Sequence, residues 1–222
     1  MKYAHKITII MLSFIFFLLF PFEIKALPNK TFNDYGVCID PGHGGYDGGA
    51  RGLYDLVEKD LNLNISIFLA NYLKQVGFDV ILTRSSDIDL VTPGIGSKKK
   101  RDLDTRIEII NNSSCDFFVS IHMNSLNDER WKGAQTFYFD FYEENKRLAE
   151  CIQESLIDTL QNTDRKAKSI SNLYLFKMVK KPGVLIEAGF LSNPSEANLL
   201  RQPKYQDLVA FSIYLGILKC LS

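Results

Sequence analysis

Short apolar segments rich in β-formers alternate along the chain with longer segments in which apolar residues recur every three or four positions. The first pattern is typical of buried strands and the second of amphipathic helices. Their alternation predicts βα units, in which a mostly parallel, twisted sheet of about six strands carries helices on both faces. We therefore expect an α/β fold with one folded domain.

The pattern also places the individual elements. Strands are expected at residues 37–40, 78–83, 117–122, 134–139 and 184–187. Helices are expected at residues 58–76, 102–112, 143–161 and 204–220, with a further helix start at 193–194. Gly77 should end the first helix, because glycine readily adopts the left-handed conformation found after many helices. The lysine-rich segment 98–101 and the polar segment 163–171 are expected to be exposed loops.

Residues 1–26 differ in character from the rest of the chain. Lys2, His5 and Lys6 precede a largely apolar run from Ile7 to Phe22. This order is typical of a secretory leader, and the run is short for a membrane span, which needs about 20 residues. We expect a leader or a membrane anchor at residues 1–26 and a catalytic domain at 27–222. The folded part should then be exported across the cytoplasmic membrane and work outside it.

Charge and cysteine content limit the binding partners and the disulfides that we expect. The chain has 26 basic and 26 acidic residues, a balance that gives no general affinity for nucleic acid. The basic cluster at 98–101 is interpreted first as a solvated surface and second as a contact for an anionic polymer. The cysteines include no C-x-x-C pair, so we expect buried free thiols, although an exported chain tolerates a disulfide. They are Cys38, Cys115, Cys151 and Cys220.

Two histidines and two glutamates lie where predicted strands end or a helix begins. His43 follows the first strand in a glycine-rich loop, Glu58 begins a helix, and His122 and Glu187 each end a strand. The carboxyl ends of parallel strands share one edge of the sheet, where ligands bind. Two histidines and a glutamate are a standard ligand set for catalytic zinc. Taken alone, the spacing leaves a zinc site and separate structural roles equally open, and a phosphate-binding loop is a weak alternative.

The motifs around these residues resemble the zinc-dependent N-acetylmuramoyl-L-alanine amidases of the amidase-3 type. Segment 40–50 (DPGHGGYDGGA) resembles the opening motif of that family, and segment 58–63 (EKDLNL) its second metal segment. Segments 120–125 (SIHMNS) and 187–193 (EAGFLSN) follow in the family order. The resemblance extends over nearly all of residues 35–220, and the motifs are specific to the family when they occur together in this order.

This resemblance implies one zinc ion per chain, bound by His43, Glu58 and His122, with Glu187 as the catalytic carboxylate. It implies hydrolysis of the amide between the lactyl group of muramic acid and L-alanine in peptidoglycan, the glycan that carries stem peptides. Zinc lowers the pKa of bound water to about 7 and polarises the carbonyl under attack. A carboxylate at hydrogen-bond distance can take the proton of that water and deliver it to the departing amine.

A compact, exported form without wall-binding repeats resembles the germination-specific amidases of endospore-forming bacteria. That resemblance implies a role in spore cortex maturation, where removal of stem peptides precedes formation of muramic-δ-lactam and later germination. Targeting would then come from the domain itself or from an accessory exported protein or lipoprotein that controls activity. Two alternatives stay open: a related zinc exopeptidase, and a non-catalytic wall-binding module, which has no need of Glu187.

Four further polar residues have two interpretations each. Asp40 and Asp47 either orient a ligand histidine or cap the glycine-rich loop, and capping is favoured for Asp47. Arg84 and Arg106 either bind a substrate carboxylate or have a structural role in ion pairs, which is the favoured interpretation.

Overall fold

A six-stranded sheet with the order β2-β1-β3-β6-β4-β5 forms the centre of the fold. The computed structural model describes residues 30–222, so the leader or anchor expected at residues 1–26 lies outside the described residues. The strands are β1 (Gly36–Pro41), β2 (Asp79–Leu82), β3 (Phe117–Asn124), β4 (Gln135–Tyr138), β5 (Lys168–Ser169) and β6 (Gly183–Phe190). Of the neighbouring strands, only β4 and β6 run antiparallel. The prediction of a mostly parallel sheet is confirmed.

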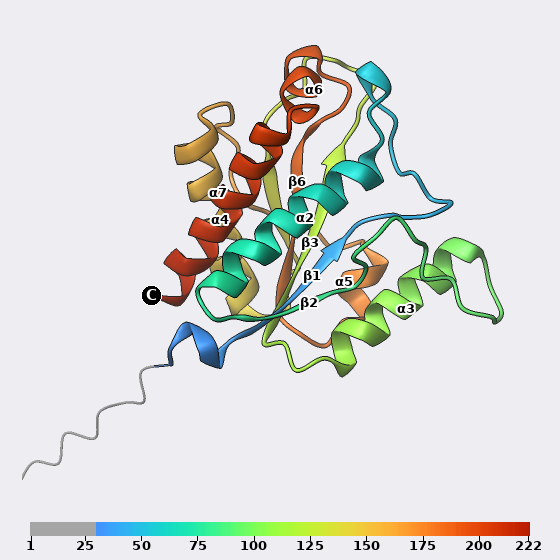
Figure 1. Cartoon of the computed structure of the whole chain (residues 1–222), viewed down its shortest axis with the longest axis vertical. Coiled ribbons are helices and arrows are strands. Elements are labelled where there is room, and N and C mark those ends of the chain that lie inside the picture. Colours follow the sequence, from blue (N-terminus) through green and yellow to red (C-terminus); the bar gives the residue numbers. More distant parts are fainter. Residues whose placement is uncertain (1–29) are drawn as a thin grey trace, which may run out of the picture. The chain divides into compact units, whose positions relative to one another are not determined.

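Helices cover both faces of this sheet, as the alternating pattern predicted. They are α2 (Glu58–Gln75), α3 (Lys98–Asn112), α4 (Glu143–Leu160), α5 (Tyr174–Met178), α6 (Pro194–Leu200) and α7 (Pro203–Leu221), with short 3-10 helices η1 (Phe32–Asp34) and η2 (Leu53–Asp55). The helices α2, α4 and α7 lie on one face, and α3 and α5 lie on the other (Figure 1). In the described part of the chain, no helix combines the length and apolar character needed to cross a membrane.

The core is divided between the two faces of the sheet. Val37 and Ile39 of β1 pack in the larger apolar cluster, whereas Cys38 between them packs in the smaller one. This division follows from the strand geometry, since successive side chains point to opposite faces. All four cysteines are free, and three of them are buried, which confirms the expectation of free thiols.

The lysine-rich segment 98–101 is not a loop, and that prediction was wrong. These residues form the first turn of α3, which begins four residues earlier than expected. The physical reason is the cap: the Ser97 hydroxyl accepts a hydrogen bond from the backbone N–H of Lys100 at 3.2 Å. The cap outweighs the unfavourable placement of positive charge at a helix N-terminus.

Four other elements differ from the expected pattern. The segment 163–171 contains the two-residue strand β5, and α5 lies in a stretch where no helix was predicted. The strands β3 and β6 continue to Asn124 and Phe190, so His122 and Glu187 lie inside strands rather than at their ends. Both side chains still lie toward the carboxyl edge of the sheet.

Candidate metal centre

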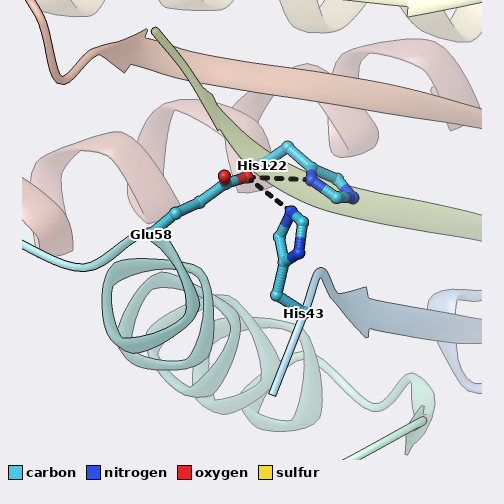
Figure 2. A group of neighbouring side chains, drawn as sticks. All are labelled: His43, Glu58 and His122. Atoms are coloured by element: carbon cyan, nitrogen blue, oxygen red, sulfur yellow. Dashed lines mark hydrogen bonds and ion pairs between the residues drawn. The ribbon is translucent and has the colours of Figure 1, made fainter. Parts of the chain in front are cut away.

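Three of the four predicted site residues meet at one point (Figure 2). His43 Nε2 lies 3.2 Å from Glu58 Oε1, and His122 Nδ1 lies 3.0 Å from the same oxygen. The three candidate ligand atoms all lie within 4.8 Å of one another. Glu187 is the register partner of His122 across the β3–β6 pair. The fold therefore brings all four residues to one place from a loop, a helix start and two strands.

A close approach of backbone and side chain positions His43 and His122. His43 has a left-handed φ of 62° directly after β1. The residue before it must be glycine, because a Cβ on Gly42 would lie 2.3 Å from Cε1 of the His122 ring. The Gly42 N–H also donates to the carbonyl oxygen of Ile121 at 3.0 Å, which ties the loop to β3.

Backbone N–H groups hold the Glu58 carboxylate in place. Its Oε2 accepts a hydrogen bond from Ala50 N at 2.8 Å, and its Oε1 accepts one from Met123 N at 3.1 Å. Gly49 packs against this carboxylate with a positive φ of 68°, and a Cβ there would lie 2.5 Å from Oε2. Glu58 is only 4% exposed, so its position is set by these contacts rather than by solvent.

Electrostatics keep Glu58 charged despite its burial. Burial alone would raise the pKa of Glu58, but its bonds with His122 and His43 hold that pKa well below the ordinary value. Burial lowers the pKa of His43, yet its contacts with Glu58 and Asp47 outweigh burial and leave this pKa raised. A charged carboxylate between two imidazole nitrogens is a donor set that suits a divalent cation.

Asp47 makes the contact that each of its two interpretations requires. Its Oδ2 lies 2.9 Å from His43 Nδ1, and its Oδ1 accepts a hydrogen bond from Gly49 N at 3.1 Å. The first contact leaves Nε2 of His43 facing Glu58. A carboxylate behind a histidine is the usual arrangement that orients a ligand imidazole toward a metal.

Glu187 contributes an unpaired carboxylate to the same site. It lines a cavity of about 270 Å³ together with His43 and His122. Its Oε2 is buried and has no hydrogen-bond partner among the residues that the structure describes. Burial raises the pKa of Glu187 to about 7, and the neighbouring charges of His122 and Glu58 act in opposite directions. Such a group can exchange a proton near neutral pH.

Comparison with known proteins agrees with this geometry. Residues 37–219 match the Amidase_3 family, described as N-acetylmuramoyl-L-alanine amidase. The chain belongs to this family. The predicted family resemblance is thereby confirmed, and the protein is an N-acetylmuramoyl-L-alanine amidase of peptidoglycan.

Individual relatives cover most of the amidase chain. The germination-specific N-acetylmuramoyl-L-alanine amidase of Bacillus subtilis strain 168 is 47% identical over 212 residues, which cover 91% of this chain and 89% of the relative. The CwlD amidase of Clostridioides difficile, solved in complex with the GerS lipoprotein, superposes with a TM-score of 0.80 at 40% identity, covering 84% of this chain and 98% of that chain. An N-acetylmuramoyl-L-alanine amidase of Clostridium difficile 630 gives 0.73 at 35% identity, covering 83% and 95%.

A buried polar network lies beneath the glycine-rich loop (residues 42–50) that presents His43 in this amidase. Arg106 donates to Asp40 Oδ1 and to Asp102 Oδ2, both at 2.7 Å, and to the carbonyl oxygens of Pro41 and His43. Arg106 and Asp40 are each 2% exposed. The role of Arg106 is therefore structural, as favoured from the sequence. Asp40 supports the loop, and its hydrogen bonds within the described residues go to Thr83, Ser120 and Arg106.

Arg84 has a structural role of a different kind. Its guanidinium donates to the carbonyl oxygens of Pro41, Gly42 and Lys59 at 2.8–3.0 Å, and it forms no ion pair within the described residues. Together the two arginines hold three consecutive carbonyl groups of the loop that presents His43. These hydrogen bonds restrain the conformation of the loop.

Sequence reasoning missed one wall of the cavity. Lys99 and Leu103 of α3 and the segment 173–176, which includes the start of α5, line the cavity beside Glu187. The apolar run Leu173-Tyr174-Leu175-Phe176 is the signal that could have indicated a buried element there. Its five-residue helix is too short for a helical period to stand out.

Proposed function

We propose that this amidase is zinc-dependent and that one zinc ion is held by His43, Glu58 and His122. The observation that carries the proposal is the convergence of two imidazole nitrogens on one buried, charged carboxylate oxygen. Three protein ligands of this kind leave a coordination position open for water or substrate. When bound, zinc supplies an acidified water and polarises the carbonyl of the amide.

We assign the proton transfers to Glu187. Glu187 lines the cavity, its buried Oε2 has no hydrogen-bond partner among the described residues, and its pKa of about 7 suits a group that first accepts and then donates a proton. In the proposed reaction Glu187 takes a proton from the attacking water. The bond between the lactyl carbonyl carbon and the L-alanine nitrogen then breaks, and Glu187 returns the proton to that nitrogen.

We further propose that the substrate is spore cortex peptidoglycan and that the amidase acts outside the cytoplasmic membrane after export. Support comes from the Bacillus subtilis relative, which is described as germination-specific. Removal of stem peptides would expose muramic acid for lactam formation. Residues 27–222 would form the catalytic domain and residues 1–26 the leader or anchor.

We also propose that an exported accessory protein controls this activity. The support is the solved complex of a similar amidase with a lipoprotein. Activity of the purified protein on intact cortex, at the rate seen with an extract of sporulating cells, would remove the need for such a partner. A rate that rises only when the extract is added is the expected result.

The proposed reaction is tested by mass spectrometry of the products formed from purified peptidoglycan in the presence of zinc. An amidase releases intact stem peptides with a free L-alanine amine. A related exopeptidase would release single residues from a free peptide terminus instead. Product mixtures of that second kind would contradict the proposal.

A further inference from the structure

The first turn of α3 contains four basic residues, and one of them, Lys99, lines the cavity that Glu187 also lines. Three of the four are engaged elsewhere. Lys98 lies over an aromatic ring at 5.5 Å, Lys100 forms an ion pair at 2.7 Å, and Arg101 donates to a backbone carbonyl at 2.6 Å. Lys99 is exposed and lines the cavity, and within residues 30–222 its ammonium group has no ion pair or hydrogen bond.

The other cation that lines the cavity cannot take up a ligand anion. Arg106 is 2% exposed, and its guanidinium is already bonded to Asp40, Asp102 and two backbone carbonyl groups. Among the described cavity-lining residues, Lys99 is therefore the one cation whose donors are available.

The wall beside Lys99 is apolar and held in place. Leu103, Leu173 and Phe176 line it, and the Tyr174 hydroxyl donates to Asp104 at 2.7 Å, which joins α5 to α3. These two helices lie on the same face of the sheet (Figure 1). A rigid apolar wall that ends in a free ammonium group suits a ligand with both aliphatic and anionic parts.

Lys99 also lies within electrostatic range of the glycine-rich loop. Burial raises the pKa of Asp47, but the bonds to His43 and Gly49 and the charges of His43 and Lys99 lower it overall. Since Asp47 contacts His43, the ammonium group and the proposed metal ligands belong to one charged neighbourhood. His43, His122 and Lys99 also line the same cavity, so a ligand bound at the proposed metal site can extend to Lys99.

We propose that Lys99 is a specificity residue that binds a carboxylate of the stem peptide on the leaving-group side of the amide. This inference rests on the proposed amidase function. Beyond L-alanine, the stem peptide continues with a D-glutamyl residue whose α-carboxylate is either free or amidated. A charge-assisted hydrogen bond from Lys99 favours the free acid, and the flexible lysine stem allows the ammonium group to reach it.

Steady-state kinetics on two matched muramoyl peptides test this inference, one with the D-glutamyl α-carboxylate free and one with it amidated. For Lys99→Gln we expect KM for the free acid to rise about threefold to tenfold, with the effect confined to KM. KM for the amidated peptide should stay within twofold of the unsubstituted protein. Lys99→Arg should restore most of the preference, because it keeps the charge.

Lys98→Gln is the matched control, since it removes the same charge from the same turn but from a side chain that lies over the Tyr46 ring. It should shift both KM values by less than twofold. Equal KM changes for the two peptides in Lys99→Gln, or no change in either, would overturn the role of Lys99. If the unsubstituted protein with bound zinc cleaves neither peptide, the amidase function itself fails, which is a distinguishable result.

Discussion

At the scale of single residues, the proposed centre depends on side chains with few alternatives. Glu58 and the two histidines supply the ligand atoms, while Glu187 has a buried oxygen that no described protein group satisfies. An unsatisfied buried oxygen costs free energy unless a ligand or water pairs with it. Glu187 is the register partner of His122, so this oxygen lies where a ligand at the proposed metal site could pair with it.

Glu187→Gln tests the assigned proton transfer. The amide keeps the shape of the side chain but cannot accept the proton, so kcat should fall by about 10²–10⁴-fold. Zinc content and thermal unfolding should stay close to those of the unsubstituted protein, which excludes simple misfolding. Turnover near the original rate would remove Glu187 from the mechanism.

Gly42→Ala tests the close approach of the loop to His122. The added Cβ would lie 2.3 Å from the imidazole ring, so the ring must move away from Glu58. We expect zinc affinity to fall by about tenfold or more, measured by competition with a chelator. The matched control is Gly48→Ala, whose new Cβ would meet Val57 at 3.3 Å and leave the ligands alone. Equal zinc affinity in the two variants would contradict this account.

At the scale of elements, the sequence predicted the fold where the periodic signal was long. The strands β1 and β3 and the helices α2, α4 and α7 were expected within a few residues of their observed bounds. The sequence also indicated that His43, Glu58 and His122 lie close together, because each follows or belongs to the carboxyl-terminal part of a strand or begins a helix at that edge. The start of α3 was missed because four basic residues resemble a loop, although Ser97 supplies a cap.

The cavity wall could not be predicted for a different reason. The place of Lys99 depends on how α3 packs against α5, and α5 is too short to show a period. A single sequence contains no direct signal for such a contact between distant segments. The proposed ligands could be brought together from the sequence because His43 follows β1, Glu58 begins α2 and His122 lies near the carboxyl end of β3.

Ser97→Ala tests the cap that starts α3. The Ser97 hydroxyl accepts a hydrogen bond from Lys100 N, and its loss should lower the free energy of unfolding by about 1 kcal/mol, measured by urea titration. Ser97→Asp should retain stability, because its carboxylate can cap and also favours the positive end of the helix. Equal stability of the alanine and unsubstituted proteins would show that the cap contributes nothing.

At the scale of the whole molecule, one buried carboxylate joins several elements beneath the glycine-rich loop. Asp40 at the end of β1 accepts hydrogen bonds from Thr83, Ser120 and Arg106 at 2.7–2.8 Å. Burial raises the pKa of Asp40, but Arg106 and the two hydroxyl groups lower it overall. The network therefore stabilises the fold as well as the loop that presents His43.

Asp40→Asn should lower the free energy of unfolding by about 2–3 kcal/mol at pH 7, because the buried guanidinium of Arg106 loses one of its two carboxylate partners and keeps only Asp102. Since the folded pKa of Asp40 is lowered from 3.8, its stabilisation is present above that value and is lost as pH falls through the folded pKa. Urea titrations at pH 7 and pH 3 should thus show a smaller difference at pH 3. Asp140→Asn is the control, because Asp140 is exposed. If the stability difference between Asp40→Asn and the unsubstituted protein were the same at both pH values, this account of Asp40 would be contradicted.

The central claim is that His43, Glu58 and His122 together hold one zinc ion. The most direct measurement is elemental analysis of the purified protein and of His122→Ala and Glu187→Gln after equilibration with zinc and removal of the excess. We predict about one zinc per chain in the unsubstituted protein and in Glu187→Gln, and almost none in His122→Ala. One zinc per chain in His122→Ala, or none in the unsubstituted protein, would contradict the proposed metal centre.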